Sequence, residues 1–298
     1  MAKQRRSLSG KVVAITGGAR GIGRAMAAAL VRKGCRVALG DVDVALARRT
    51  AEELGGGTIA VGLDVTDRSS FAAFLDEAER QLGPLDVLIN NAGIMPVTPL
   101  AEESDDSIRR QLDINVYGVI AGTQLALERM RPRGGGHIVN VASSAGKAGV
   151  PGIATYSATK HAVVGFTEAA RAEYGSEGID FSYVMPITVN TQLIEGLRDQ
   201  RGVKRVEPED VARETVDALE TGKVDVYVPR QLRASVMMGA LSPRRVREAV
   251  ARFMGIDKVM TEVSPEARRA YEERAAHSEP GVEDGSPSGA HSTEREAA

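Results

Sequence analysis

Short apolar runs alternate with segments of helical periodicity from residue 11 to about residue 228 of this chain. The expected strands span residues 12–15, 37–39, 58–63, 87–89, 137–141, 181–184 and 224–228. The expected helices span residues 22–33, 44–54, 71–82, 108–130, 158–174 and 208–219. Strands and helices that alternate in this way indicate right-handed βαβ units that share one open sheet. The sequence therefore predicts an α/β fold, with a doubly wound parallel sheet of about seven strands and helices on both faces.

Composition and charge agree with this prediction. Hydrophobic residues make up 43% of the chain and Trp is absent, so Val, Ile, Leu and Ala have to build the core, which suits a parallel sheet. The net charge of -2 gives no reason to expect nucleic acid or a membrane surface as a partner. Cys35 is the single cysteine, so an intrachain disulfide is excluded. We see neither a targeting signal nor a clean apolar span, and we expect a cytoplasmic protein.

A glycine-rich turn, Thr16 to Gly23, joins the first expected strand to the first expected helix. Its glycines allow a tight turn and a close approach of the backbone to a pyrophosphate. The helix that follows offers free N–H groups and a partial positive charge to an anion. Such a turn alone is a weak signal, because glycines also end strands for steric reasons. Its position between a strand and a helix makes a dinucleotide site the better interpretation.

The second expected strand ends on an acid, Asp41. A carboxylate at this place in a dinucleotide fold accepts hydrogen bonds from the adenosine ribose and repels a 2′-phosphate. Asp41 therefore favours NAD, with NADP as the weaker alternative. Two neighbours leave other interpretations open: Asp43 would make Asp41 an ordinary turn residue, and Arg20 could pair with a 2′-phosphate. We give Asp41 more weight, because an unpaired carboxylate against a phosphate costs more than a nearby cation gains.

Tyr156 and Lys160 stand four residues apart, which places both side chains on one face of a helix. A cation beside a phenol favours the phenolate and lowers the tyrosine pKa toward the range that a general acid or base needs. This pair alone is a weak signal, because it also arises by chance. Ser143 adds to it, because it follows the strand expected at residues 137–141. In open α/β sheets, ligands bind at such carboxyl ends of strands.

Several motifs now stand in one order along the chain. They are Thr16-Gly17-x-x-x-Gly21-x-Gly23, Asn90-Asn91-Ala92-Gly93, Asn115, Ser143, and Tyr156-x-x-x-Lys160 with Ser143 thirteen residues before Tyr156. In these motifs the chain resembles the short-chain dehydrogenase/reductase family, in its short-subunit branch, over about residues 8–228. The resemblance implies a Rossmann-type fold and an NAD(P)-dependent oxidoreductase that acts on CH–OH or C=O groups.

The resemblance also implies roles for individual residues. Tyr156 would exchange a proton with the substrate oxygen, Ser143 would polarise the carbonyl, and Lys160 would hold the nicotinamide ribose and shift the Tyr156 pKa. Asn115 would position a water that relays protons past Lys160. Asp64 matches the acid that contacts the adenine. The implied cofactor-binding set is Gly17, Arg20, Gly21, Ile22, Gly23, Asp41, Asp64, Val65, Asn91, Ala92, Gly93, Tyr156, Lys160, Pro186 and Thr191, without a metal.

One position departs from the family pattern. The family usually has Pro-Gly after the sixth strand, whereas this chain has Pro186-Ile187. Ile187 crowds a place where the backbone normally meets the cofactor's carboxamide, and we interpret it as a change in pocket shape. Thr191 still matches the threonine that often contacts the carboxamide.

The chain beyond residue 230 differs in character. Two helices are expected there, over residues 243–253 and 265–275, after an apolar patch at residues 236–238 and 240–241. The first helix is basic, with Arg244, Arg245, Arg247 and Arg252. We expect it to pack on the domain or on a partner subunit; a substrate-access flap or a membrane-surface contact is the alternative. The predicted division is a dinucleotide-binding and catalytic domain (1–230), a helical extension (231–277) and a disordered tail (278–298).

The substrate is the least constrained part of the prediction. Two apolar loops, residues 94–97 and 150–153, favour a hydrophobic ketone or secondary alcohol of lipid, steroid-like or terpenoid type. Residues 192–205 are expected to form a movable, more polar lid, so a charged tail on the substrate stays open. The alternatives are a sugar-nucleotide epimerase or dehydratase, and an NAD-binding redox sensor without turnover. Family habit implies a homodimer or homotetramer through the helices at 108–130 and 158–174.

Overall fold

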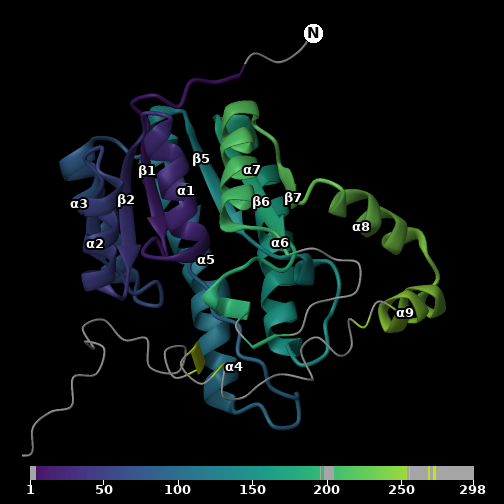
Figure 1. Ribbon diagram of the computed structural model, residues 1–298. Helices are drawn as coiled ribbons and strands as arrows, with labels where there is room; N and C mark the ends of the chain where they lie inside the picture. The colour runs from purple at the N-terminus through teal and green to yellow at the C-terminus, as the bar shows by residue number, and fades with distance from the viewer. Residues whose placement is uncertain are drawn as a thin grey trace, which may run out of the picture.

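A seven-stranded sheet with the strand order β3-β2-β1-β4-β5-β6-β7 lies at the centre of the structure (Figure 1). The computed structural model describes residues 5–194, 196–197, 205–253, 255, 268 and 271–272. All neighbouring strands of this sheet are parallel. The strands are β1 (Val12–Thr16), β2 (Arg36–Asp41), β3 (Ile59–Gly62), β4 (Val87–Asn90), β5 (Gly136–Val141), β6 (Ile179–Pro186) and β7 (Asp225–Val228). The predicted doubly wound parallel sheet is confirmed.

The helices begin where the sequence supplies caps. Asp43 accepts a hydrogen bond from the backbone N–H of Leu46 at 2.9 Å, and Asp67 accepts one from Ser69 at 2.8 Å. Such caps satisfy N–H groups that have no partner within the helix. The α-helices of the described chain are α1 (Gly21–Arg32), α2 (Val44–Leu54), α3 (Arg68–Leu82), α4 (Asp105–Leu112), α5 (Gly118–Met130), α6 (Ala154–Tyr174), α7 (Pro208–Thr221), α8 (Leu232–Leu241) and α9 (Arg244–Phe253).

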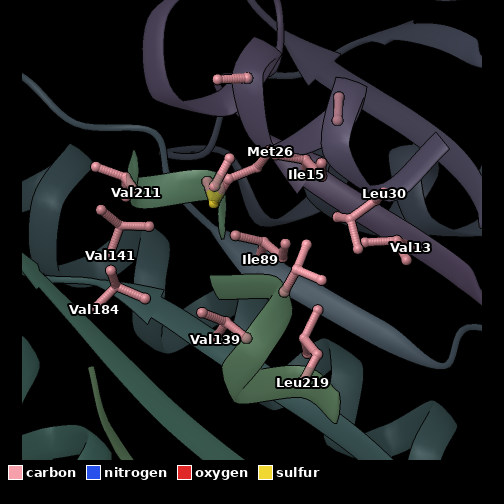
Figure 2. Close-up of a cluster of buried hydrophobic side chains, with 14 of the residues drawn as sticks. Val13, Ile15, Met26, Leu30, Ile89, Val139, Val141, Val184, Val211 and Leu219 are labelled. Carbon is pink, nitrogen blue, oxygen red and sulfur yellow. The ribbon is translucent and has the colours of Figure 1, made fainter. Parts of the chain in front are cut away.

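Two apolar cores sandwich the sheet. On one face, α1 and α7 lie side by side, and Figure 2 shows Met26 and Leu30 of α1 in one cluster with Val211 and Leu219 of α7 and the strand residue Val139. On the other face, side chains of α3, α5 and the end of α6 cover the strands. Because both faces are covered, the strands are apolar almost throughout, as a parallel sheet requires.

The strand order reverses direction between β1 and β4. From β1 the chain winds outward through β2 to β3, and it then returns to lay β4 on the other side of β1. The loops after these two neighbouring strands therefore leave in opposite directions and open a crevice at the carboxyl edge of the sheet. In open α/β sheets this crevice is where ligands bind.

The long helix expected over residues 108–130 is confirmed, but a π-helical turn that the sequence did not predict interrupts its α-helical hydrogen bonding. The structure has α4, then a π-helical turn at Asp113–Tyr117, then α5. Asn115 lies inside the π turn and its amide bonds both the N–H and the carbonyl of Ile94, at 2.9 Å each. The extra residue of a π turn rotates this side chain out of the regular helical series. Hydrophobic periodicity does not reveal such a turn, because both flanking helices keep their own apolar faces.

After β7, the first helix begins at Leu232, about ten residues before the first helix that the sequence predicted there. The basic helix expected at 243–253 is α9, and the apolar patch before it forms a helix of its own, α8. Leu, Met and Ala, which are good helix formers, dominate α8. The expected helix at 265–275 is described only at Arg268, Tyr271 and Glu272, all in helical conformation. Most of the expected lid and the whole tail at 278–298 lie outside the described residues. None of the described helices combines the length and apolarity needed to cross a membrane.

One buried histidine makes the stability of the fold depend on pH. His137 on β5 is 5% exposed, its Nε2 lies 2.7 Å from the Ser182 hydroxyl, and burial lowers its pKa from 6.5 to about 4. The unfolded chain therefore binds a proton below pH 6.5 that the folded chain rejects until about pH 4. We predict that the contribution of His137 to the free energy of unfolding falls by about 3 kcal/mol as the pH is lowered from 6.5 to about 4.

Urea unfolding at several pH values, compared between the wild type and His137→Gln, measures this contribution. For each protein, the free energy of unfolding is plotted against pH. The difference between the two slopes gives the contribution of His137, because the carboxylates titrate in both proteins. Parallel curves from pH 7 to pH 4 would contradict the prediction.

Candidate active site

A cleft of about 2590 Å³ opens at the carboxyl edge of the sheet, beside the strand reversal. Nearly all residues of the predicted site line it. Gly23 and Asn115 are the exceptions: Asn115 is fully buried beneath the cleft, and Gly23 lies inside α1. The topology thus gathers into one crevice residues that are up to about 170 positions apart along the chain.

The backbone of the glycine-rich turn adopts conformations and close contacts that only glycine accommodates without strain. Gly17 and Gly21 have φ values of +63° and +54°, in the left-handed region where a side chain is strained. A Cβ on Gly23 would lie 2.8 Å from Nδ2 of Asn91 and closer still to the carbonyl oxygen of Gly17. No side chain caps the N-terminus of α1. The turn therefore presents an uncapped, positively polarised helix end to the cleft, which fits a pyrophosphate.

Hydrogen bonds join the ends of β1 and β4 at the strand reversal. The Thr16 hydroxyl accepts the backbone N–H groups of Asn91 at 2.9 Å and Ala92 at 3.0 Å. In return, the Asn91 amide donates to the carbonyls of Thr16 and Gly17, both at 2.9 Å. The sequence analysis named Thr16 only as the first residue of the glycine-rich motif and did not predict that it bonds the segment after β4. A hydroxyl residue that ends the strand before a glycine turn was the available signal for this bracing role.

Asp41 is held by the backbone around it. Its two carboxylate oxygens accept the N–H groups of Ala19 at 3.0 Å and Asp43 at 3.1 Å. Burial raises the pKa of Asp41, and these two hydrogen bonds oppose that rise. A carboxylate has about four acceptor sites, so Asp41, which lines the cleft, keeps acceptor capacity for a ligand hydroxyl.

The two residues that competed with Asp41 in the sequence bond each other. Arg20 forms a salt bridge with Asp43, which also caps α2. Asp43 thus caps α2 and pairs with Arg20, and the positive charge of Arg20 is partly balanced by the Asp43 carboxylate. Both observations favour Asp41 as the residue that faces the adenosine ribose.

Asp64 and Val65 line the cleft after β3. The Asp64 carboxylate accepts the N–H and the hydroxyl of Thr66, at 2.8 and 2.7 Å, which fixes its direction. The Val65 side chain fits against α5 because position 118 is a glycine: a Cβ there would lie 3.0 Å from Val65. These contacts fix the positions of Asp64 and Val65 at the edge of the cleft next to β3.

Tyr156 and Lys160 lie on one face of α6, with Lys160 Nζ 5.6 Å from the centre of the Tyr156 ring. Both side chains are buried, and burial raises the Tyr156 pKa to about 12 and lowers the Lys160 pKa to about 8. A hydrogen bond with Ser143 partly offsets the rise for Tyr156. Lys160 donates to the carbonyl of Val141 at 2.8 Å, which anchors the amine at the end of β5.

The structure refines the sequence argument about these two residues. The cation was expected to lower the Tyr156 pKa directly, but burial dominates, and the hydrogen bond to Ser143 is what lowers it. Lys160 lies over the ring and gives its hydrogen bond to the Val141 carbonyl. A phenol in this setting keeps its proton at neutral pH until a ligand brings further charge.

Asn115 reaches the same neighbourhood from the π turn. Its amide, besides holding Ile94, donates to the Thr159 hydroxyl at 3.2 Å. A Cβ on Gly93 would lie 3.1 Å from Oδ1 of Asn115 and 3.5 Å from Nζ of Lys160. Gly93 therefore leaves a small polar space between the amide and the amine. The water relay expected here stays a prediction.

Pro186, Ile187 and Thr191 line the cleft on the β6 side. Ile187 is partly buried against the core, and its N–H donates to the carbonyl of Val228 at 2.9 Å. The Thr191 methyl would lie 3.4 Å from a Cβ on Gly21, so this loop faces the glycine-rich turn across the cleft.

Residues 11–202 match the family described as short chain dehydrogenase. The chain belongs to the short-chain dehydrogenase/reductase family. The family assignment makes it an NAD(P)-dependent oxidoreductase that acts on CH–OH groups, as predicted from the motifs.

Among its relatives, sorbitol dehydrogenase of Cereibacter sphaeroides is 39% identical over 191 residues, which cover 64% of this chain and 75% of that protein. The 17-beta-hydroxysteroid dehydrogenase 13 of Rattus norvegicus is 30% identical over 260 residues, 85% of this chain and 86% of that protein. A solved short-chain dehydrogenase/reductase from Burkholderia phymatum in complex with NAD superposes with a TM-score of 0.72 at 28% identity, covering 78% of this chain and 93% of that one.

In this dehydrogenase, residues near position 270 also lie close to Tyr156, and the sequence analysis did not predict this contact. Arg268 is 2% exposed and donates to the carbonyls of Met95 at 2.9 Å and Leu193 at 3.0 Å. The Tyr271 hydroxyl accepts the N–H of Met95 at 2.8 Å, and Arg268 pairs with Glu272 at 2.8 Å. We call Arg268, Tyr271 and Glu272 the clamp. It holds the loop after β4 to the loop after β6.

The clamp lies at an apolar part of the cleft beside Tyr156, where Tyr271 and Glu272 line the cleft. The buried side chains packed there are Met95, Ala145, Ile153, Tyr156, Ile194 and Leu197. The only sequence signal for the clamp was a helical pattern in a charged segment, which is usually a solvated surface. Its role depends on a contact between residues more than 170 positions apart.

We predict that Gly23→Ala weakens NAD binding at least about tenfold, because the added methyl group collides with the backbone of the glycine-rich turn. Isothermal titration calorimetry with NAD measures the loss, and circular dichroism checks the fold. Gly165→Ala is the matched control, because a Cβ on that helical glycine meets nothing within 4 Å. Unchanged affinity in Gly23→Ala would sink the assignment of this turn to the cofactor.

Proposed function

We propose that this dehydrogenase transfers a hydride between NAD(H) and a hydrophobic secondary alcohol or ketone, with Tyr156 as its acid–base residue. The observation that carries the proposal is the meeting of Tyr156, its Ser143 partner and a buried amine at the cleft, next to apolar side chains that line the cleft. The cofactor, when bound, supplies or accepts the hydride.

The residues of the crevice fit a dinucleotide. The glycine-rich turn and the uncapped end of α1 would hold the pyrophosphate. Asp41 would accept the ribose hydroxyls of the adenosine end, and Lys160 would hold the other ribose. Ala92, Gly93 and Thr191 would line the path between them, and Ile187 would narrow it.

Tyr156 would act on the substrate oxygen. Its raised pKa keeps the phenol protonated in the free protein, which suits it to donate a proton when a ketone is reduced. In the oxidation direction the same oxygen would take the alcohol proton. The Ser143 hydroxyl would bond the substrate oxygen and stabilise charge that develops on it. Lys160, with a pKa of about 8, would carry a positive charge at neutral pH and favour the phenolate form that arises during turnover.

The cleft beside Tyr156 supports a hydrophobic substrate over a polyol. Met95, Ala145, Ile153 and Ile194 line the cleft there, and the polar groups that the clamp brings are already bonded to one another and to the backbone. The relative that the chain matches over 85% of its length is named a hydroxysteroid dehydrogenase, whereas the match to sorbitol dehydrogenase covers 64%. A pairing of chains through α5 and α6 remains a prediction.

We predict that Tyr156→Phe lowers kcat by at least about a thousandfold and leaves the NAD dissociation constant nearly unchanged, because only the proton-transferring hydroxyl is lost. The assay follows nicotinamide absorbance with a panel of hydrophobic secondary alcohols and ketones. Tyr174→Phe is the matched control, since Tyr174 lies at the far end of α6 and does not line the cleft. Equal turnover in Tyr156→Phe would remove Tyr156 from the reaction, and NAD binding without turnover on any substrate would favour the sensor alternative.

We predict that Asp41→Ala lowers the ratio of kcat/KM with NAD to kcat/KM with NADP by roughly tenfold to a hundredfold, because it removes both a ribose acceptor and the repulsion of a 2′-phosphate. Steady-state kinetics with each cofactor gives the ratio. Asp86→Ala is the control: its carboxylate likewise accepts a backbone N–H, from Val12 at 2.9 Å, but does not line the cleft. A wild-type preference for NADP would overturn the NAD assignment.

A further inference from the structure

The helix α9 carries an apolar face that the described chain leaves uncovered. Val246, Val250 and Phe253 recur at helical spacing and fall on one side of the helix. They are 50%, 50% and 82% exposed, and no residue of α9 is buried. A surface helix of a globular domain normally buries such a face against the core. Packing of this helix on its own domain, one of the outcomes expected from the sequence, is therefore not what the structure has.

The preceding helix continues this surface. Leu232 and Val236 pack α8 against the cluster around β7, so α8 is fixed to the domain at one side. Met237, Met238 and Leu241 are exposed. We call α8 and α9 together the arm. Figure 1 shows the arm extending away from the sheet and its covering helices.

Arginines border the apolar face of the arm. At about 100° per residue, Arg245 and Arg252 lie on one flank of the face and Arg247 on the other. Arg244 is paired with Glu248, the single acid of α9, at 2.6 Å. Within the described part of the chain, no carboxylate forms a salt bridge with Arg245, Arg247 or Arg252. The helix is thus apolar at its centre and cationic at both edges.

We propose that the arm docks on the surface of a lipid bilayer that contains anionic headgroups. The apolar face would enter the boundary between headgroups and acyl chains, while the long arginine side chains reach back to the headgroups on either side. The charge of the edges complements an anionic surface and adds attraction for each arginine. None of this requires a helix that spans the membrane.

A second copy of the chain fits the arm less well. In a twofold contact the same patch meets itself, so the arginines of one copy would face those of the other. Nucleic acid would match the charge but leave the apolar face without a partner. The bilayer surface satisfies both the apolar centre and the cationic edges.

The arm also borders the cleft. Val236, Met238, Val246 and Val250 line it together with Tyr156. Docking would bring the mouth of the cleft to the bilayer, from which a hydrophobic alcohol or ketone could enter. This last step rests on the proposed function; the docking itself does not depend on the reaction.

Vesicle sedimentation tests the docking with the full-length protein. We expect binding to vesicles of phosphatidylcholine mixed with phosphatidylglycerol, and weaker binding to phosphatidylcholine alone. The double variant Arg245→Glu/Arg252→Glu is expected to lose at least about twentyfold in partition to the mixed vesicles. Phe253→Asp should lose a comparable amount, because it places a charge in the apolar face.

The charge-matched control is Arg32→Glu/Arg80→Glu, which changes two exposed arginines on α1 and α3 and should bind mixed vesicles as the wild type does. All variants should keep wild-type turnover of a water-soluble alcohol, since none of these residues lines the cleft. Three outcomes would overturn the proposal: no wild-type binding to mixed vesicles, equal binding by the arm variants, or a Phe253→Asp protein whose mass by light scattering falls to a smaller oligomer. Vesicle binding is read without substrate, so its failure is separable from failure of the proposed reaction.

Discussion

The hydrogen bonds between Thr16 and the Asn91 segment hold the whole site together. They join the ends of two strands from which the chain departs in opposite directions, so they fix the width of the crevice. One hydroxyl and one amide satisfy four backbone groups there. The glycine-rich turn leaves from one side of this brace, and the loop that carries Gly93 leaves from the other. Loss of either side chain would leave buried backbone groups unpaired at the point where a cofactor has to fit.

Burial then sets the chemical state of the residues above the brace. Tyr156 and Lys160 are shifted in opposite senses by the same low-dielectric surroundings, which disfavour phenolate and ammonium alike. At neutral pH Tyr156 is therefore uncharged, whereas Lys160 still carries its proton but holds it less tightly than an exposed lysine does. Charge that a bound ligand brings to the cleft acts strongly in such surroundings, which is how a tyrosine can serve an acid–base reaction near neutral pH.

The sequence was sufficient for the sheet and for most of the crevice, because both follow from local patterns. Alternating strands and helices have few allowed connections, and parallel order places strand ends together. The π turn at Asn115 was not predictable, since one inserted residue leaves the periodicity of α4 and α5 intact. The clamp was missed for a different reason: Arg268 and Tyr271 look like surface residues until the fold brings Met95 to them. The interaction of Arg20 with Asp43 likewise required the geometry of the loop.

The clamp lies beyond residue 202, outside the part of the chain that matches the family. Ser143, Tyr156 and Lys160 lie inside that part. The surroundings of Tyr156 thus combine residues from inside the family match, such as Met95 and Ile153, with clamp residues from outside it, and the two stretches meet only after folding. Sequence change in the last stretch can reshape the cleft beside Tyr156 while Ser143, Tyr156 and Lys160 stay in place. Similarity to the family therefore indicates the type of reaction more directly than it indicates the substrate.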